Sequence, residues 1–167
     1  MLERELEKEF DRYKKIVCDP FRVESLFVDT FLSSYKRPPK EIIIDVDATD
    51  DILHGNQEGR FFHGYYDNYC YLPLYIFCED HLLAAKLRTS DRDGADGTKE
   101  ELIRIIGQIR QSWPDVRIIV RGDSGFCRDE LMDWCEQNFV DYIFGLARNK
   151  RLVRRICRAL KKVKKNF

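Results

Sequence analysis

Two aspartates at the end of an apolar run are the first residues whose types and spacing could carry chemistry. Residues 42–51 read IIIDVDATDD, and β-branched residues that end in carboxylates are typical of a buried strand leading into a site. Successive strand residues point to opposite faces, so Asp45 and Asp47 would share one face. Acidic residues at a strand end more often form a solvated loop, and this is the role we expect for Asp50 and Asp51.

A further aspartate follows a second apolar run. Residues 116–120 read VRIIV and lead into Arg121-Gly122-Asp123-Ser124-Gly125, so Asp123 would stand in a glycine-containing turn directly after a strand. If this strand lies beside the one that carries Asp47, the two carboxylates form a pair. Carboxylates that face each other repel unless a hard divalent cation neutralises them, and Mg²⁺ or Mn²⁺ prefers such oxygen ligands.

Periodicity predicts the elements that must position these acids. Asp19 and Pro20 indicate the capped start of a helix, and Thr98 with Glu101 fits a capping box at the start of another. The predicted elements, in chain order, are helices over 2–17 and 20–35, a strand over 42–46, hairpin strands over 70–77 and 82–87, a helix over 98–109, a strand over 116–120, a helix over 128–137, a strand over 140–146 and a helix over 150–165.

This order of elements predicts a fold class. A hairpin meander followed by strand and helix crossovers is the order of an α/β, ribonuclease H-like mixed sheet with flanking helices, here preceded by two N-terminal helices. We predict a helical segment over 1–36 and a ribonuclease H-like catalytic domain over 41–167. In that fold the strands leading to Asp47 and Asp123 are parallel neighbours, and both carboxylates emerge at the edge where ligand sites form. Two ions roughly 4 Å apart at such a site would support phosphodiester cleavage and transfer.

Composition narrows the class of protein. A chain of 167 residues with 44% hydrophobic content is long enough for one domain with a sizeable core. No apolar run reaches the roughly 20 residues of a membrane span, and no signal peptide follows Met1, so we expect a cytoplasmic protein with no membrane partner. The six cysteines form no CxxC pair, which favours small buried residues over a zinc or redox site.

Aromatic residues are concentrated between residues 61 and 71, after a polar loop that ends in Arg60. Aromatics interleaved with Arg and His could stack on unpaired bases. The alternative, that they pack beneath the sheet or support the acidic loop, is at least as well favoured by the sequence.

Four segments carry a resemblance to a known family. The segments DVDATDD, HGNQEGRFFHGYYDNYCYLPLYIFC, RGDSGF and YIFGLARN resemble the DDE domain of group 1 bacterial insertion-sequence transposases, over residues 25–152. The resemblance implies a ribonuclease H-like fold, Mg²⁺ or Mn²⁺, and cleavage and transfer of DNA at transposon ends and target. It also implies a nucleoid location and allows a homodimer on DNA. Its Asp-x-Thr pattern makes Asp47 the first catalytic aspartate, with Asp45 as rival, and Asp123 the second.

The chain departs from the family at the third acid, which in such transposases is a glutamate on a later helix. After Glu136 there is no glutamate, and Asp141 is the last acid. We therefore expect an incomplete metal site, a fragment of a longer transposase, and a chain inactive by itself. The alternative function is a non-catalytic DNA-binding remnant.

Positive charge is concentrated at the C-terminal end. Ten Lys or Arg and no Asp or Glu occur from Arg148 to Lys165, although the formal net charge of the chain is zero. This asymmetry indicates an anionic partner, although a solvated face is the ordinary role of a charge run. The residues that we predict to contact DNA are Arg60, Arg121, Arg148, Lys150, Arg151, Arg154 and Arg155.

Overall fold

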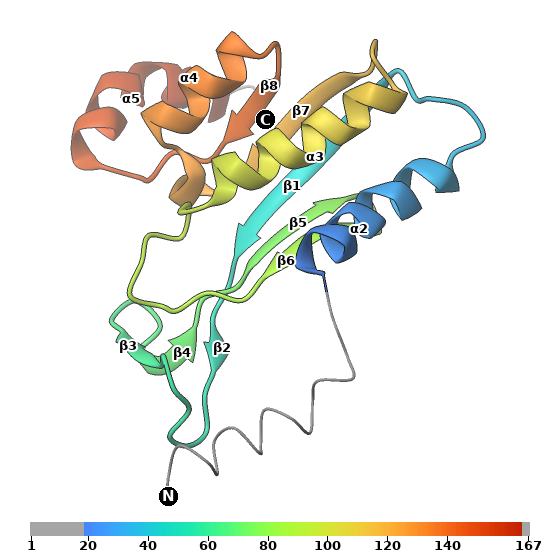
Figure 1. The fold of residues 1–167 in the computed structure, drawn as a ribbon. Coiled ribbons are helices and arrows are strands. Elements are labelled where there is room, and N and C mark those ends of the chain that lie inside the picture. Colours follow the sequence, from blue (N-terminus) through green and yellow to red (C-terminus); the bar gives the residue numbers. More distant parts are fainter. Residues whose placement is uncertain (1–18, 165–167) are drawn as a thin grey trace, which may run out of the picture.

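The computed structural model describes residues 19–164 (Figure 1). The helix predicted over 2–17 lies outside the described residues. The elements are α2 (Pro20–Ser34), β1 (Glu41–Ala48), β2 (Asp51–Ile52), β3 (Phe61–His63), β4 (Asn68–Tyr71), β5 (Leu74–Cys78), β6 (His81–Lys86), α3 (Thr98–Ser112), β7 (Arg117–Gly122), the short 3₁₀ helix η1 (Ser124–Phe126), α4 (Asp129–Gln137), β8 (Asp141–Phe144) and α5 (Lys150–Lys164).

A five-stranded mixed sheet forms the centre of the fold, in the order β6-β5-β1-β7-β8. The β5–β6 hairpin lies antiparallel to β1, whereas β7 and β8 run parallel to it. A hairpin on one side of the first strand and two parallel crossover strands on the other are the arrangement expected of the ribonuclease H-like fold. The predicted fold class is therefore confirmed for the sheet and its helices, and α2 is the second of the two predicted N-terminal helices.

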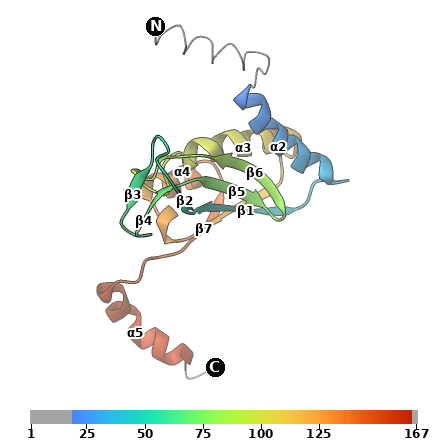
Figure 2. The same ribbon diagram turned by 90° about the horizontal axis from the view of Figure 1, so that it is seen from below.

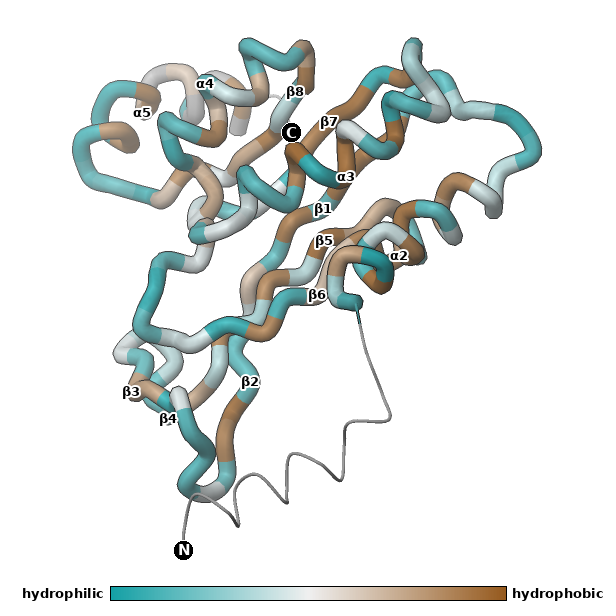
Figure 3. The backbone as a smooth tube through the Cα atoms, viewed as in Figure 1, coloured by the Kyte–Doolittle hydropathy of each residue, from teal (hydrophilic) through white to brown (hydrophobic). Residues whose placement is uncertain are grey.

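The core lies between one face of this sheet and the helices. Ile42, Ile44 and Val46 alternate along β1 and are buried, and Ile118 and Val120 of β7 lie in the same cluster. Figure 3 shows hydrophobic residues concentrated along β1, β5 and β7. Helices α2, α3 and α4 contribute further buried residues to this cluster: Val28, Phe31, Leu102, Ile105, Ile106, Ile109, Leu131 and Cys135. The alternation leaves Asp45 and Asp47 on the opposite face of β1, where they are partly or largely exposed.

The predicted start of α2 is confirmed, and that of α3 is wrong in detail. The Asp19 carboxylate accepts hydrogen bonds from the backbone N–H of Phe21 (3.1 Å) and Arg22 (3.4 Å). Gly97, in the left-handed region with φ 76°, precedes α3 in the cap position instead of Thr98. The side chain of Glu101 does not reach back to the cap because it binds Lys86 and Arg104.

A second, smaller sheet follows β1 directly, in the order β2-β4-β3 (Figure 1). The single strand predicted over 70–77 is divided between β4 and β5, which belong to different sheets. Pro73 lies at the division and has no N–H for a strand ladder. The small sheet and the C-terminal end of β1 therefore lie next to each other.

Helix α5 projects away from the central sheet (Figure 2). Asn149 caps it, because its side-chain oxygen accepts a hydrogen bond from the N–H of Leu152 at 2.7 Å. The division into 1–36 and 41–167 stays a prediction; α2 packs against β6 and α3. Within residues 19–164 no helix is long and apolar enough to cross a bilayer.

Candidate active site

The parallel register of β1 and β7 brings the two predicted acids together. Asp45 lies opposite Arg121, and Val46 lies opposite Gly122. One further step along both strands places Asp47 next to Asp123, because neighbouring strands lie about 4.8 Å apart. Both side chains are exposed. Asp47 and Asp123 therefore lie one step beyond the last paired residues, Val46 and Gly122, at the C-terminal edge of the parallel strands.

The turn after β7 fixes the position of Asp123. Its Oδ1 accepts a hydrogen bond from the backbone N–H of Gly125 at 2.7 Å, which leaves Oδ2 for another ligand. A Cβ on Gly122 would lie 2.8 Å from Cγ2 of Val46, so only glycine allows β7 to pass this close to β1. The Gly-Asp-Ser-Gly sequence thus serves both the tight packing and the orientation of one carboxylate.

Asp45 is engaged by Arg121. Its Oδ1 and Oδ2 accept hydrogen bonds from Nε (2.5 Å) and Nη2 (2.8 Å) of the guanidinium. The hydrogen bond and the charge of Asp45 raise the pKa of Arg121. This two-point pairing favours Asp47 over Asp45 as a first metal ligand, and it leaves Nη1 of Arg121 as the nitrogen not used by Asp45.

Tyr66 is a residue at this edge that the sequence did not single out. It lies in the turn between β3 and β4, and its hydroxyl donates to the backbone oxygen of Ala48 at 3.4 Å. Burial raises the pKa of Tyr66, and the charges of Asp50, Asp47 and Asp123 raise it further. Its hydroxyl therefore lies within the field of the acidic residues. The aromatic run contained this signal, but spacing alone could not tell which ring faces the acids.

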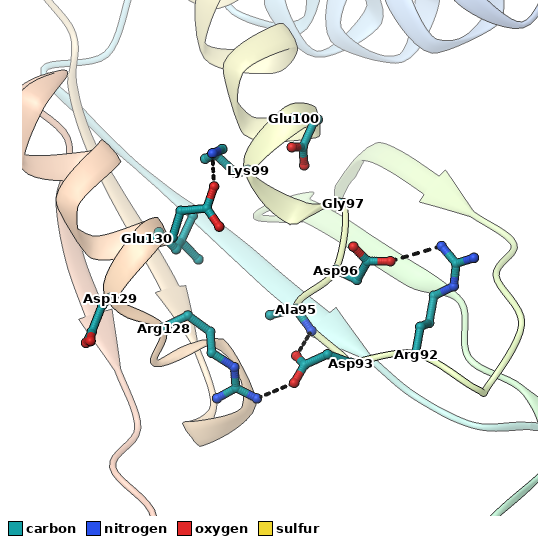
Figure 4. A pocket seen from close by; sticks show the side chains of 11 residues that line it. Arg92, Asp93, Ala95, Asp96, Gly97, Lys99, Glu100, Arg128, Asp129 and Glu130 are labelled. Atoms are coloured by element: carbon teal, nitrogen blue, oxygen red, sulfur yellow. Dashed lines mark hydrogen bonds and ion pairs between the residues drawn. The ribbon is translucent and has the colours of Figure 1, made fainter.

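A polar cleft of about 610 Å³ lies near this edge, between the 91–97 loop and the first turns of α3 and α4 (Figure 4). Ala48 is close to the loop, since a Cβ on Gly94 would lie 3.6 Å from its Cβ. The lining cations are engaged in ion pairs: Arg92–Asp96 (3.0 Å), Arg128–Asp93 (2.7 Å) and Lys99–Glu130. The hydrogen bond from Arg128 lowers the pKa of Asp93. Each cation in the described lining is therefore already paired, and the cleft presents no unpaired cation to an anionic ligand.

Comparison with known proteins decides the family. The chain matches the family described as transposase DDE domain group 1 over residues 5–167. The chain belongs to this family. The resemblance seen in the sequence is thus confirmed.

Solved transposase structures are similar to this DDE domain only at a distance. The catalytic domain of Mos1 mariner transposase has 12% identity and a TM-score of 0.46, with 79% of this chain and 64% of that chain covered. A piggyBac transposase synaptic complex with hairpin DNA has 14% identity and a TM-score of 0.42, with 69% and 24% covered. The chain thus spans less than two thirds of the length of the Mos1 domain. No curated protein matches the chain.

The one acid that follows Glu136 in the sequence lies away from this edge. Asp141, the last acid of the chain, starts β8 and lies opposite Ile119, toward the other end of the sheet. It binds Arg117 at 2.7 Å, and Arg117 also binds Glu41. Among residues 19–164 no group of three or more His, Cys, Asp or Glu could hold a metal ion. Carboxylates such as those of Asp47 and Asp123 are the hard oxygen donors that Mg²⁺ or Mn²⁺ prefers, and here they would form a set of two.

The cations predicted to contact DNA lie on different parts of this transposase domain. The guanidinium carbon of Arg60 lies 4.8 Å from the ring centroid of Tyr69, and its Nη1 donates to the backbone oxygen of Gly55. Arg121 lies beside Asp45 on the open face of the sheet. Helix α5 stands away from the sheet (Figure 2), and five exposed cations lie in its first turns or just before it: Arg148, Lys150, Arg151, Arg154 and Arg155.

Proposed function

We propose that this chain is the catalytic domain of a DDE transposase, which cleaves and transfers DNA strands with Mg²⁺ or Mn²⁺ held by Asp47 and Asp123. The observation that supports the proposal is the parallel register of β1 and β7, whose last pair, Val46 and Gly122, directly precedes Asp47 and Asp123. Family membership supports the same reaction class. Asp45 is assigned to Arg121 and not to the metal.

The residues around the two acids have separate tasks in this proposal. A bound divalent cation would activate the attacking oxygen and neutralise charge on the phosphate. The N–H of Gly125 holds one carboxylate oxygen of Asp123, so the other is directed to the ligand position. Tyr66 holds the end of β1 through the Ala48 carbonyl. Arg121 is placed by Asp45 to offer Nη1 to a DNA phosphate.

The DNA substrate would consist of transposon ends and target, bound by a homodimer in the nucleoid. The five cations at the start of α5 would neutralise phosphates without reading sequence, so binding by α5 would weaken steeply with salt. Arg60 would contact the backbone nearer to the acids, since β3 follows it in the small sheet next to β1.

A non-catalytic DNA-binding remnant is the second candidate function. The observation that favours it is the absence of a three-acid group within residues 19–164. Two carboxylates hold a cation less firmly than three, while the basic residues of α5 would still bind DNA.

Nicking of supercoiled plasmid DNA distinguishes the two candidates. The enzyme is supported if the chain nicks plasmid with Mg²⁺ or Mn²⁺ but not with EDTA, and if Asp123→Asn abolishes the nicking. The matched control is Asp80→Asn, which removes the same charge from the exposed β5–β6 turn at the other end of the sheet. A catalytic fragment without its third acid is expected not to nick by itself, so DNA binding without nicking would support the remnant only if Asp123→Asn also leaves Mn²⁺ affinity unchanged.

A further inference from the structure

The small sheet exposes aromatic rings on one of its surfaces. Phe62 of β3 and Tyr69 of β4 are cross-strand partners, and their ring centroids lie 5.5 Å apart in an edge-to-face arrangement. Arg60 lies over the Tyr69 ring. Tyr65 is exposed at the turn between the two strands. We group it with these residues and call the set the aromatic face: Arg60, Phe62, Tyr65 and Tyr69.

The rings of the aromatic face do not belong to the core. The exposed fraction is 54% for Phe62, 49% for Tyr69 and 86% for Tyr65. This excludes the interpretation that these three rings pack beneath the sheet. Exposed aromatic residues grouped on one surface, next to an arginine, mark a binding site more often than scattered single side chains do.

The aromatic face is connected to the candidate active site. The Tyr65 ring meets the Tyr66 ring edge to face at 5.0 Å, and the Tyr66 hydroxyl reaches the Ala48 carbonyl. Ala48 is the residue after Asp47, and β2 of the small sheet begins three residues later. A DNA strand at Asp47 and Asp123 would therefore have the aromatic face as its neighbour.

We propose that the aromatic face stacks unpaired DNA bases next to the position of strand cleavage. The proposal rests on the proposed function and adds the form of the substrate: a duplex with unpaired nucleotides. Every base has a π face, so Phe62 and Tyr65 could each take one base without reading its identity. Arg60, whose guanidinium carbon lies 4.8 Å from the centroid of the Tyr69 ring, would offer nitrogens to the adjoining phosphate.

The size and composition of the surface favour this occupant over a second protein chain. β3 and β4 have only three and four residues, whereas a stable protein interface buries about 800 Å² on each partner. Aromatic rings interleaved with arginine are typical of sites for single-stranded nucleic acid.

The test compares two DNA probes of the same length, one fully paired and one with a single-stranded overhang that contains 2-aminopurine. We expect the full chain to bind the overhang probe more tightly and to quench its base fluorescence. Phe62→Leu and Tyr65→Leu should each weaken overhang binding roughly tenfold, with little change for the paired probe. Phe21→Leu, an exposed aromatic at the start of α2, is the matched control.

Three results would overturn the inference. The first is an overhang affinity that neither variant changes. The second is a loss of affinity that is equal for the overhang probe and the paired probe. The third is a concentration-dependent dimer of the chain that both variants abolish, which would assign the surface to a protein contact. Far-UV circular dichroism of the variants identifies a loss that arises from unfolding. A preference for the overhang in a chain whose Mn²⁺ affinity is unchanged by Asp123→Asn would sustain the aromatic face while contradicting the catalytic function, so the two failures are distinguishable.

Discussion

The carboxylate of Asp45 and the guanidinium of Arg121 join β1 and β7 by two hydrogen bonds, two residues before Asp47 and Asp123. The pair is partly exposed, so solvent screens it and its net contribution to the free energy of unfolding should be small. Its greater effect is electrostatic, since Arg121 balances a carboxylate that would otherwise add to the charge of the candidate metal site.

Asp45→Asn should therefore weaken Mn²⁺ binding only a few-fold, because it leaves the charge of Arg121 unbalanced near the site. Arg121→Gln should tighten Mn²⁺ binding and weaken DNA binding, and the double variant should return Mn²⁺ affinity close to that of the parent chain. Isothermal titration calorimetry gives the affinities. If Asp45→Asn removed Mn²⁺ binding as completely as Asp47→Asn, Asp45 would be the ligand.

Tyr66→Phe should lower the free energy of unfolding by about 1 kcal/mol or less, since the hydroxyl makes one long hydrogen bond to Ala48. Tyr66→Ala should cost more, because it also removes the ring contacts with His63 and Tyr65. Urea unfolding followed by circular dichroism measures both. Equal losses would show that the hydroxyl, and not the ring, carries the contribution of Tyr66.

Buried thiols should resist alkylation. Burial raises the pKa of Cys78 to about 12 and that of Cys135 to about 11, so both stay protonated at pH 8. The pKa values of both thiols in the folded chain exceed their ordinary value of 9.0. The two thiols therefore stabilise the folded chain fully below pH 9.0, and this contribution to the free energy of unfolding is lost as the pH rises through their pKa values in the folded chain.

Mass spectrometry after brief treatment with iodoacetamide at pH 8 checks this order. Cys127, which is only partly buried, should be labelled in the folded chain. Cys78 and Cys135 should be labelled only after urea is added. If all three cysteines were labelled at the same rate, the strand that holds Cys78 and the helix that holds Cys135 would unfold locally under native conditions.

Phe31→Ala tests whether α2 is part of the same core as the sheet. Phe31 is fully buried and packs edge to face against Tyr35, His81 and Trp113. Its truncation should cost about 3–5 kcal/mol of unfolding free energy. Phe21→Ala, on the exposed side of the same helix, should change it little. Similar effects of the two changes in chemical denaturation would contradict the packing of α2.

The sequence allowed prediction of those features that depend on local pattern. The strand with Asp47, the strand before Asp123 and the cap at Asp19 were all predicted, because apolar alternation and a cap followed by proline are local signals. The family motifs then supported the pairing of the two acids.

Features that depend on contacts distant in sequence were not predictable. The Asp45–Arg121 pair joins residues 76 positions apart, and no local pattern specifies it. Glu101 was predicted to cap α3, but Lys86 and Arg104 compete for its carboxylate. Tyr66 could not be told from its aromatic neighbours, because only the fold of the small sheet selects the ring whose hydroxyl reaches the Ala48 carbonyl.

Mn²⁺ binding followed by electron paramagnetic resonance is the most direct test of the central claim that Asp47 and Asp123 share one cation. The parent chain and Asp80→Asn should bind Mn²⁺ with the same affinity, while Asp47→Asn and Asp123→Asn should each weaken binding at least tenfold. If both substitutions leave Mn²⁺ affinity equal to that of Asp80→Asn, the two carboxylates do not form a metal site and the proposed catalytic function fails.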